Sequence, residues 1–134
     1  MAMTTTSGVQ SLASEAPDVA GLAAAACLFR GFGDPSRMAI LQHLALGEHR
    51  VVDLTAHLGL AQSTVSTHLA CLRDCGLVAA RPQGRATVYS LRHDEALMDL
   101  WAAAERLLAL TGDAVTLCPS SGADATSGTE QGAR

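Results

Sequence analysis

The amino-acid sequence predicts a mainly α-helical domain that carries one small β-hairpin. Hydrophobic residues make up 49% of the 134 positions and aromatic residues only 3%, and abundant Ala and Leu favour helices over a sheet-based core. Apolar residues recur at helical spacing along most of the chain, and the spacing changes once, to two short strand-like runs around a turn. We therefore expect a single domain of several helices and one hairpin.

Both ends of the chain lack this periodicity. Residues 1–17 and the stretch after 117 are rich in Ser, Thr, Ala and Gly, a composition typical of segments without regular structure. The sequence thus predicts a disordered tail at 1–17, a folded domain at 18–117 and a flexible tail at 118–134. No apolar run approaches the ~20 residues of a membrane-crossing helix, and no signal segment opens the chain, so we expect a cytoplasmic protein without membrane contact.

The folded region opens with two predicted helices. Asp18 can cap a first helix that runs to about Arg30, where two nearby glycines interrupt it. Asp34–Pro35 supplies an N-cap and a proline at the first helical position, so a second helix is expected from there to Leu46.

Two further helices follow in close succession. Val51–Leu58 and Gln62–Cys75 are each closed by a glycine, which is the residue that best adopts the left-handed cap conformation. On a helical wheel Val65 aligns with Leu69 and Leu72, so these three should face the core. Helix, tight glycine-containing turn and helix together form the helix-turn-helix unit that many DNA-binding proteins use.

The hairpin and a long last helix complete the domain. Leu77–Arg81 and Thr87–Leu91 bracket Pro82–Arg85, the pattern of two strands joined by a turn, and this hairpin would be the wing of a winged helix-turn-helix. Asp94–Leu110 predicts the last helix. Because the first and last helices are more apolar than a small monomer can cover, we expect them to form a homodimer interface. The alternative is that the last helix packs within its own core.

Positive charge is concentrated where the helix-turn-helix lies. The net charge of the whole chain is -4, yet Gln62–Arg92 carries +3 and the remainder -7. DNA binding requires such a local cationic surface. Arg85 at the hairpin tip is the best candidate for a minor-groove or backbone contact, and Arg81 and Arg92 are candidates for phosphate contacts. Each arginine alone is equally well explained as a solvated surface charge.

The start of the fourth helix offers polar side chains that can read DNA. In a helix-turn-helix the N-terminal residues of the second helix contact base edges in the major groove. The candidate DNA-binding residues of this helix are Gln62, Ser63, Thr64, Ser66 and Thr67. Glutamine can bond adenine in a bidentate manner, and hydroxyls can bond bases or phosphates. The alternative is that the hydroxyls merely cap the helix.

Ordered motifs along the chain carry a family resemblance. They are Phe32–Leu41, Leu54–Leu58, Gln62–Leu69, Leu72–Val78 and Gly84–Arg85. Over residues 20–110 the sequence resembles the ArsR/SmtB family of metal-responsive repressors. The resemblance implies a homodimeric winged helix-turn-helix that sits on operator DNA when free and leaves it when an inducer binds.

Two of the sensor sites known in that family are missing from this sequence. One uses a Cys-x-Cys in the third helix, but the corresponding stretch His49–Asp53 has no thiol. Another uses paired Asp, His and Glu residues on the last helix. This chain has such residues near the start of that helix, but Arg106 and Ala109 stand where the later partners should be.

The remaining candidate site consists of thiols. Cys71 and Cys75 lie four residues apart on one face of the fourth helix, and Cys118 lies in the C-terminal tail. The arrangement resembles the cadmium- and lead-sensing CmtR branch of the family, in which two such cysteines join a tail cysteine from the other subunit. Three thiolates suit soft ions such as Cd(II) and Pb(II). The alternative is that the helix cysteines are small packing residues; Cys27, within the apolar first helix, is expected to be a core residue.

The same sequence allows other functions. A thiol redox, persulfide or arsenite-responsive repressor of the same fold is the main alternative, since exposed cysteine pairs also oxidise. The sequence lacks a phosphate-binding glycine loop, a His-Glu-x-x-His motif and a nucleophile elbow, so we expect no enzyme. A dimeric interaction module that does not bind DNA would show no salt-dependent binding to duplexes.

Overall fold

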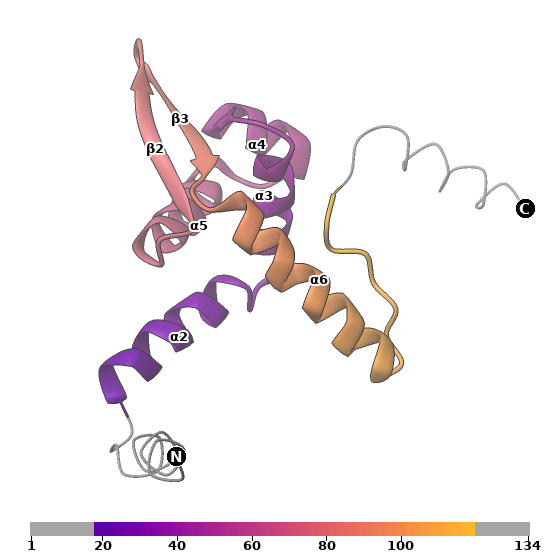
Figure 1. Ribbon diagram of the computed structural model, residues 1–134. Helices are drawn as coiled ribbons and strands as arrows, with labels where there is room; N and C mark the ends of the chain where they lie inside the picture. Colours follow the sequence, from indigo (N-terminus) through magenta and orange to yellow (C-terminus); the bar gives the residue numbers. More distant parts are fainter. Residues whose placement is uncertain (1–17, 120–134) are drawn as a thin grey trace, which may run out of the picture.

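The computed structural model describes residues 18–119. These residues form five α-helices and three strands: α2 (Val19–Gly31), α3 (Pro35–Ala45), β1 (His49–Arg50), α4 (Val51–Leu58), α5 (Gln62–Asp74), β2 (Val78–Gln83), β3 (Ala86–Leu91) and α6 (Asp94–Leu110). The mainly α fold with a hairpin wing is therefore confirmed (Figure 1). The predicted tail at 1–17, and the other predicted tail beyond residue 119, lie outside the described residues. None of the described helices is both long and apolar enough to cross a membrane.

Helix boundaries follow the local signals. Asp34 Oδ2 accepts a hydrogen bond from the backbone N–H of Arg37 at 3.0 Å, so it caps α3 as the sequence predicts. Gly59 and Gly76 both adopt left-handed backbone conformations, with φ of 68° and 79°, at the ends of α4 and α5. Asp18 also precedes its helix, but within the described residues its side chain makes no capping hydrogen bond.

The sheet is antiparallel, with strand order β1-β3-β2. The hairpin turn is tighter than expected, because Pro82 and Gln83 belong to β2 and pair with β3. Proline is tolerated there since β2 is an edge strand, and Gly84, with φ of 63°, supplies the turn. The sequence did not predict β1, because a strand of two residues is too short to show an alternation of polar and apolar side chains. In the structure His49 of β1 pairs with Tyr89 of β3.

The core lies where α3, α4, α5 and α6 meet. Its fully buried large side chains are Ile40, Leu41, Leu54, Val65, Leu69, Leu72 and Trp101. The predicted stripe of α5 is confirmed, because Val65, Leu69 and Leu72 are all completely buried. Burying this stripe fixes the rotation of α5 about its axis and leaves the opposite face of the helix in solvent.

Helix α2 is set apart from the rest of the domain (Figure 1). Val19 and Phe29 are 74% and 58% exposed, and on α6 Leu107 and Leu110 are 63% and 84% exposed. A single chain therefore leaves apolar surface uncovered on both of the helices for which a dimer interface is predicted.

Candidate nucleic-acid interface and thiol sites

The N-terminal half of α5 presents polar side chains to solvent. All five predicted residues there, Gln62, Ser63, Thr64, Ser66 and Thr67, are exposed. The alternative in which Ser63 caps the helix is wrong: the N-cap is Ala61, and no side chain of the described residues caps this end. Thr67 Oγ1 donates to the carbonyl oxygen of Ser63 at 2.9 Å. The first-turn backbone N–H groups thus remain available to a phosphate.

A polar groove connects this helix end to the wing. The groove has a volume of about 330 Å³, and its lining includes Gln62 of α5 together with Arg85 and Thr87 of the hairpin. Two of the predicted DNA-binding residues therefore share one surface depression, although they are far apart in sequence. Arg50 also lines the groove and was missed by the sequence reasoning, because it lies outside the cationic segment. Its side chain lies 3.4 Å from the carboxylate of Asp53.

The three predicted arginines differ in their surroundings. Arg81 Nη2 lies 2.7 Å from Glu48 Oε1 in an ion pair whose side chains are about half exposed. Across residues 18–119, neither Arg85 nor Arg92 has an ion-pair partner, and both are exposed. The Arg81 charge is therefore partly neutralised in the free protein, whereas the other two are free to attract phosphate.

A polar cluster links the middle of α5 to the neighbouring helices. His68 lies with Nδ1 3.5 Å from Arg37 Nη1 and with Nε2 3.6 Å from Asp34 Oδ2. Arg37 Nη2 also donates to the carbonyl oxygen of Arg30 at 2.6 Å, at the end of α2. The backbone N–H of Arg37, and more weakly His68, hold the pKa of Asp34 below its usual value, against the opposing effect of desolvation. The cluster therefore joins α2, α3 and α5 at one point.

The cysteines pair differently from the sequence prediction. Cys75, at the end of α5, forms a disulfide with Cys27 of α2, and their Cα atoms are 5.7 Å apart. The interpretation of Cys27 as a core residue is wrong: it is half-buried and lies outside the buried cluster, because α2 diverges from the core. Cys71, one turn before Cys75, is a free, half-buried thiol.

Cys118 is held against α6 by the segment that precedes it. The Glu105 carboxylate accepts from the backbone N–H groups of Leu117 and Cys118, at 2.6 and 2.8 Å. These two hydrogen bonds hold the pKa of Glu105 below its usual value. Burial, and then the negative charges of Glu105 and Asp99, raise the pKa of the Cys118 thiol. The start of the predicted flexible tail is thus fixed to the domain.

The three predicted metal ligands do not meet within one chain. Among residues 18–119, no group of three or more His, Cys, Asp or Glu side chains is arranged to hold a metal ion. Cys118 Sγ lies 3.5 Å from the carbonyl oxygen of Met98 on α6. Figure 1 shows this segment and α5 on opposite sides of α6. A site built from Cys71, Cys75 and Cys118 would therefore need the tail of a second copy.

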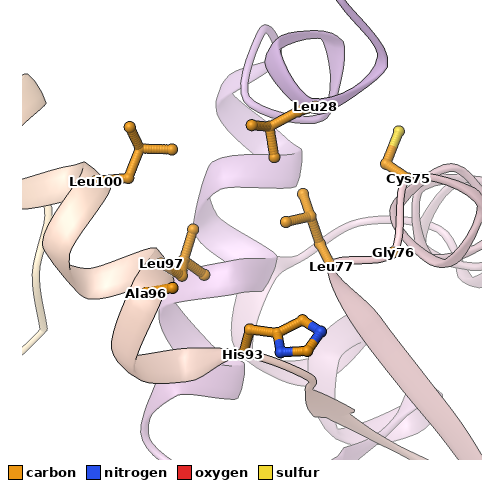
Figure 2. Close-up of a pocket in the computed structure, with 8 residues that line it drawn as sticks. All are labelled: Leu28, Cys75, Gly76, Leu77, His93, Ala96, Leu97 and Leu100. Atoms are coloured by element: carbon orange, nitrogen blue, oxygen red, sulfur yellow. The ribbon is translucent and has the colours of Figure 1, made fainter. Parts of the chain in front are cut away.

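Apolar cavities lie beside the two outer helices. One cavity of about 310 Å³ has Leu28 of α2 on one side and Leu97 and Leu100 of α6 on the other. Figure 2 shows Cys75 at the edge of this cavity and Leu77 pointing into it. Another cavity of about 320 Å³ includes Phe29 and Trp101 in its lining. Both cavities adjoin the exposed apolar surface of α2 and α6. The C-terminal end of α5 borders this surface.

Comparisons with known proteins match this architecture. The model of the family described as "Bacterial regulatory protein, arsR family" matches residues 34–80. The chain is 39% identical over 90 residues to a "Probable mercury resistance operon repressor" from Streptomyces lividans, covering 67% of this chain and 71% of that protein. It is 42% identical over 90 residues to the HTH-type transcriptional regulator CmtR from Mycobacterium tuberculosis, covering 67% and 76%. A homodimeric winged helix-turn-helix DNA-binding domain from Mycobacterium bovis matches with a TM-score of 0.62 and 28% identity, covering 69% and 85%.

These matches confirm the family resemblance and the predicted fold. The segment matched by the family model runs from the N-cap of α3 into β2, and so contains the whole helix-turn-helix. The chain therefore belongs to the arsR family of bacterial regulatory proteins, and it is a winged helix-turn-helix transcriptional regulator rather than an enzyme.

Proposed function

We propose that the protein is a homodimeric repressor that releases operator DNA when a soft heavy-metal ion binds. The ligands would be Cys71 and Cys75 of one subunit together with Cys118 of the other subunit. The observation that carries the proposal is the division of α5 into two functional ends. Its first turns present exposed polar side chains, and its last turn carries two cysteines. A ligand at the second end acts on the same rigid helix that would read DNA. Because its target is operator DNA, the proposal places the protein in the cytoplasm.

DNA contact is assigned to α5 and the wing. With its buried stripe facing the core, α5 can enter the major groove with Gln62 toward base edges and the hydroxyl side chains toward bases or phosphates. Arg85 then reaches the adjacent minor groove or backbone, and Arg92 and Arg81 serve phosphates. The groove shared by Gln62 and Arg85 supports this arrangement, and it adds Arg50 as a further phosphate-binding candidate.

Dimerisation is assigned to α2 and α6. Exposed apolar side chains on these helices, together with the two cavities beside them, form a surface that a second copy can cover. The homodimeric relative from Mycobacterium bovis supports this assignment. A two-fold dimer would place the two α5 helices on DNA half-sites about 34 Å apart.

The metal assignment rests on the chemistry of the donors. Three thiolates without a fixed fourth ligand favour large, soft ions, and Cd(II) or Pb(II) is therefore the proposed inducer. CmtR from Mycobacterium tuberculosis is a cadmium metal-sensor, which supports this choice. The Streptomyces lividans relative is named a probable mercury resistance operon repressor, so Hg(II) must also be tested as an inducer. Cys75 must be in its reduced form to act as a ligand.

Metal binding would change the position of α5 within the dimer. A metal bound at the end of α5 would tie that helix to the segment that Glu105 holds against α6 in the other subunit. A dimer constrained in this way would fit successive grooves less well. Typical coupling free energies of about 1–3 kcal/mol would lower operator affinity about 5- to 150-fold.

The test compares single cysteine variants of the reduced full-length protein. Cys71→Ser, Cys75→Ser and Cys118→Ser should each weaken the Cd(II)-thiolate absorption band, because one of three thiolates is gone, and should keep operator binding when Cd(II) is added. Cys27→Ser is the matched control and should behave like the parent, because Cys27 is not among the proposed ligands. Pb(II), Zn(II), Hg(II) and arsenite are titrated in parallel. Operator release by Cd(II) that survives all three ligand substitutions would show the assignment to be wrong.

A further inference from the structure

We propose that Cys27 and Cys75 form an oxidisable dithiol, which a hydroperoxide converts to a disulfide that withdraws Cys75 from metal binding. The first support is geometric. The two residues are 48 positions apart in sequence, and the fold places their Cα atoms 5.7 Å apart, within the usual range for disulfide-bonded cysteines. Both side chains are half-buried, so a small oxidant can reach them.

Arg30 and Cys75 both lie close to Cys27. Arg30, one turn later on α2, places Nη2 3.5 Å from Cys27 Sγ. On the other side, Cys75 Sγ lies 2.9 Å from the carbonyl oxygen of Cys27.

The chemistry balances with a hydroperoxide as the oxidant. One of the two sulfurs attacks the peroxide oxygen as a thiolate, the O–O bond breaks, and a sulfenic acid forms while the alcohol, or water from hydrogen peroxide, leaves. The other sulfur then attacks the sulfenic acid sulfur, and water leaves as the S–S bond forms. Two thiols are oxidised by two electrons, and one peroxide is reduced.

Cys27 is a better partner for Cys75 than Cys71 is. Cys71 and Cys75 are four residues apart on one helix, and the Cα–Cβ bonds of α5 all tilt toward its N-terminus, so joining these sulfurs would distort its last turn. Cys27 instead reaches Cys75 from a different helix.

Oxidation would have two effects on the regulator. Cys75 cannot be both a disulfide sulfur and a thiolate ligand, so the oxidised protein keeps only Cys71 and Cys118 for metal. This part rests on the proposed function. The disulfide also ties α2, which carries exposed apolar surface, to the end of α5. We therefore expect peroxide to make the protein unresponsive to the metal.

The experiment begins with the fully reduced full-length protein and no metal. A small excess of hydrogen peroxide is added and then removed, free thiols are counted, and non-reduced peptides are mapped by mass spectrometry. Two of the four thiols should disappear, and the cross-linked peptide should contain Cys27 and Cys75. Cys71→Ser should form the same cross-link. A Cys71–Cys75 cross-link, or four surviving thiols, would overturn the proposal.

The second measurement tests the consequence for metal binding. After oxidation the Cd(II)-thiolate band of the parent should be weaker and should need more Cd(II) to appear, because one of three thiolates is gone, and dithiothreitol should restore it. Cys27→Ser should keep the band after the same peroxide dose, because Cys75 lacks its partner. Full Cd(II) binding by the mapped disulfide form would contradict the withdrawal of Cys75. If the reduced protein binds no Cd(II), the proposed function fails. The peptide map still tests whether Cys27 and Cys75 form a disulfide, because that measurement uses no metal.

Discussion

Replacing Arg85 by alanine should weaken DNA binding in a strongly salt-dependent way. Arg85 is exposed, lines the groove at the start of α5, and has no ion-pair partner in the part of the chain that the structure describes. Each phosphate contact contributes about 0.9 to the slope of log affinity against log salt concentration. A dimer loses two such contacts when Arg85 is replaced, so the slope should fall by about 1.8.

Arg81 supplies a matched comparison within the same hairpin. Its guanidinium is held 2.7 Å from the Glu48 carboxylate, an exposed pair of the kind that is worth about 0.2–1 kcal/mol. Arg81→Ala should therefore cost less DNA affinity than Arg85→Ala, because contact with a phosphate must first break this pair. Glu48→Gln should strengthen binding, since it frees the Arg81 charge and removes a negative one.

The assay is fluorescence anisotropy at several salt concentrations, with a duplex that the protein has itself selected from a random-sequence pool. Circular dichroism confirms that each variant is folded. Equal slopes for the parent and Arg85→Ala, or a larger loss for Arg81→Ala than for Arg85→Ala, would refute the assignment of Arg85 as the principal wing contact.

Three further predictions concern α5, the tail and the start of α3. Leu69→Ala should destabilise the protein by about 2–5 kcal/mol, measured by urea unfolding, because Leu69 is completely buried; a loss below about 1 kcal/mol would contradict the packing. Cd(II) affinity should increase from pH 6 to pH 8, because the raised pKa of Cys118 keeps this thiol protonated across the range and Cd(II) must displace its proton; metal titrations giving equal affinities would argue against Cys118 as a ligand. Asp34→Ala should lower the Tm at pH 7. Because folding lowers the pKa of Asp34, its carboxylate stabilises the folded state fully above the unfolded-state pKa of 3.8. This stabilisation is lost as the pH falls through the lower folded-state pKa. Calorimetry at pH 3 should therefore show a smaller Tm difference between Asp34→Ala and the parent.

Most helix boundaries could be predicted because local chemistry determines them. Val51–Leu58 and Asp94–Leu110 match the observed α4 and α6 in full, and α3 begins where Asp34 and Pro35 place it. Caps, left-handed glycines and apolar spacing act within a few residues of each other, so the sequence displays them directly. The exposure of the polar side chains at the start of α5 follows from its buried stripe in the same way.

Features that depend on contacts between distant segments could not be predicted. The pairing of Cys27 with Cys75 depends on how α2 leaves the core, and no local pattern records that direction. The contact of Glu105 with the segment before Cys118 likewise depends on the chain turning back after α6. The His68 cluster was missed because its members come from three helices. The proposed metal site takes its ligands from two subunits, and within one chain Cys71, Cys75 and Cys118 do not come together.

The coupling between metal and DNA is tested most directly by one measurement on the reduced full-length protein. Operator affinity and the Cd(II)-thiolate absorption are followed in the same sample as Cd(II) is added, with the selected duplex as the probe. We predict that operator affinity falls about 5- to 150-fold over the same Cd(II) concentrations at which the absorption band grows. A saturated band with unchanged operator affinity would contradict the account.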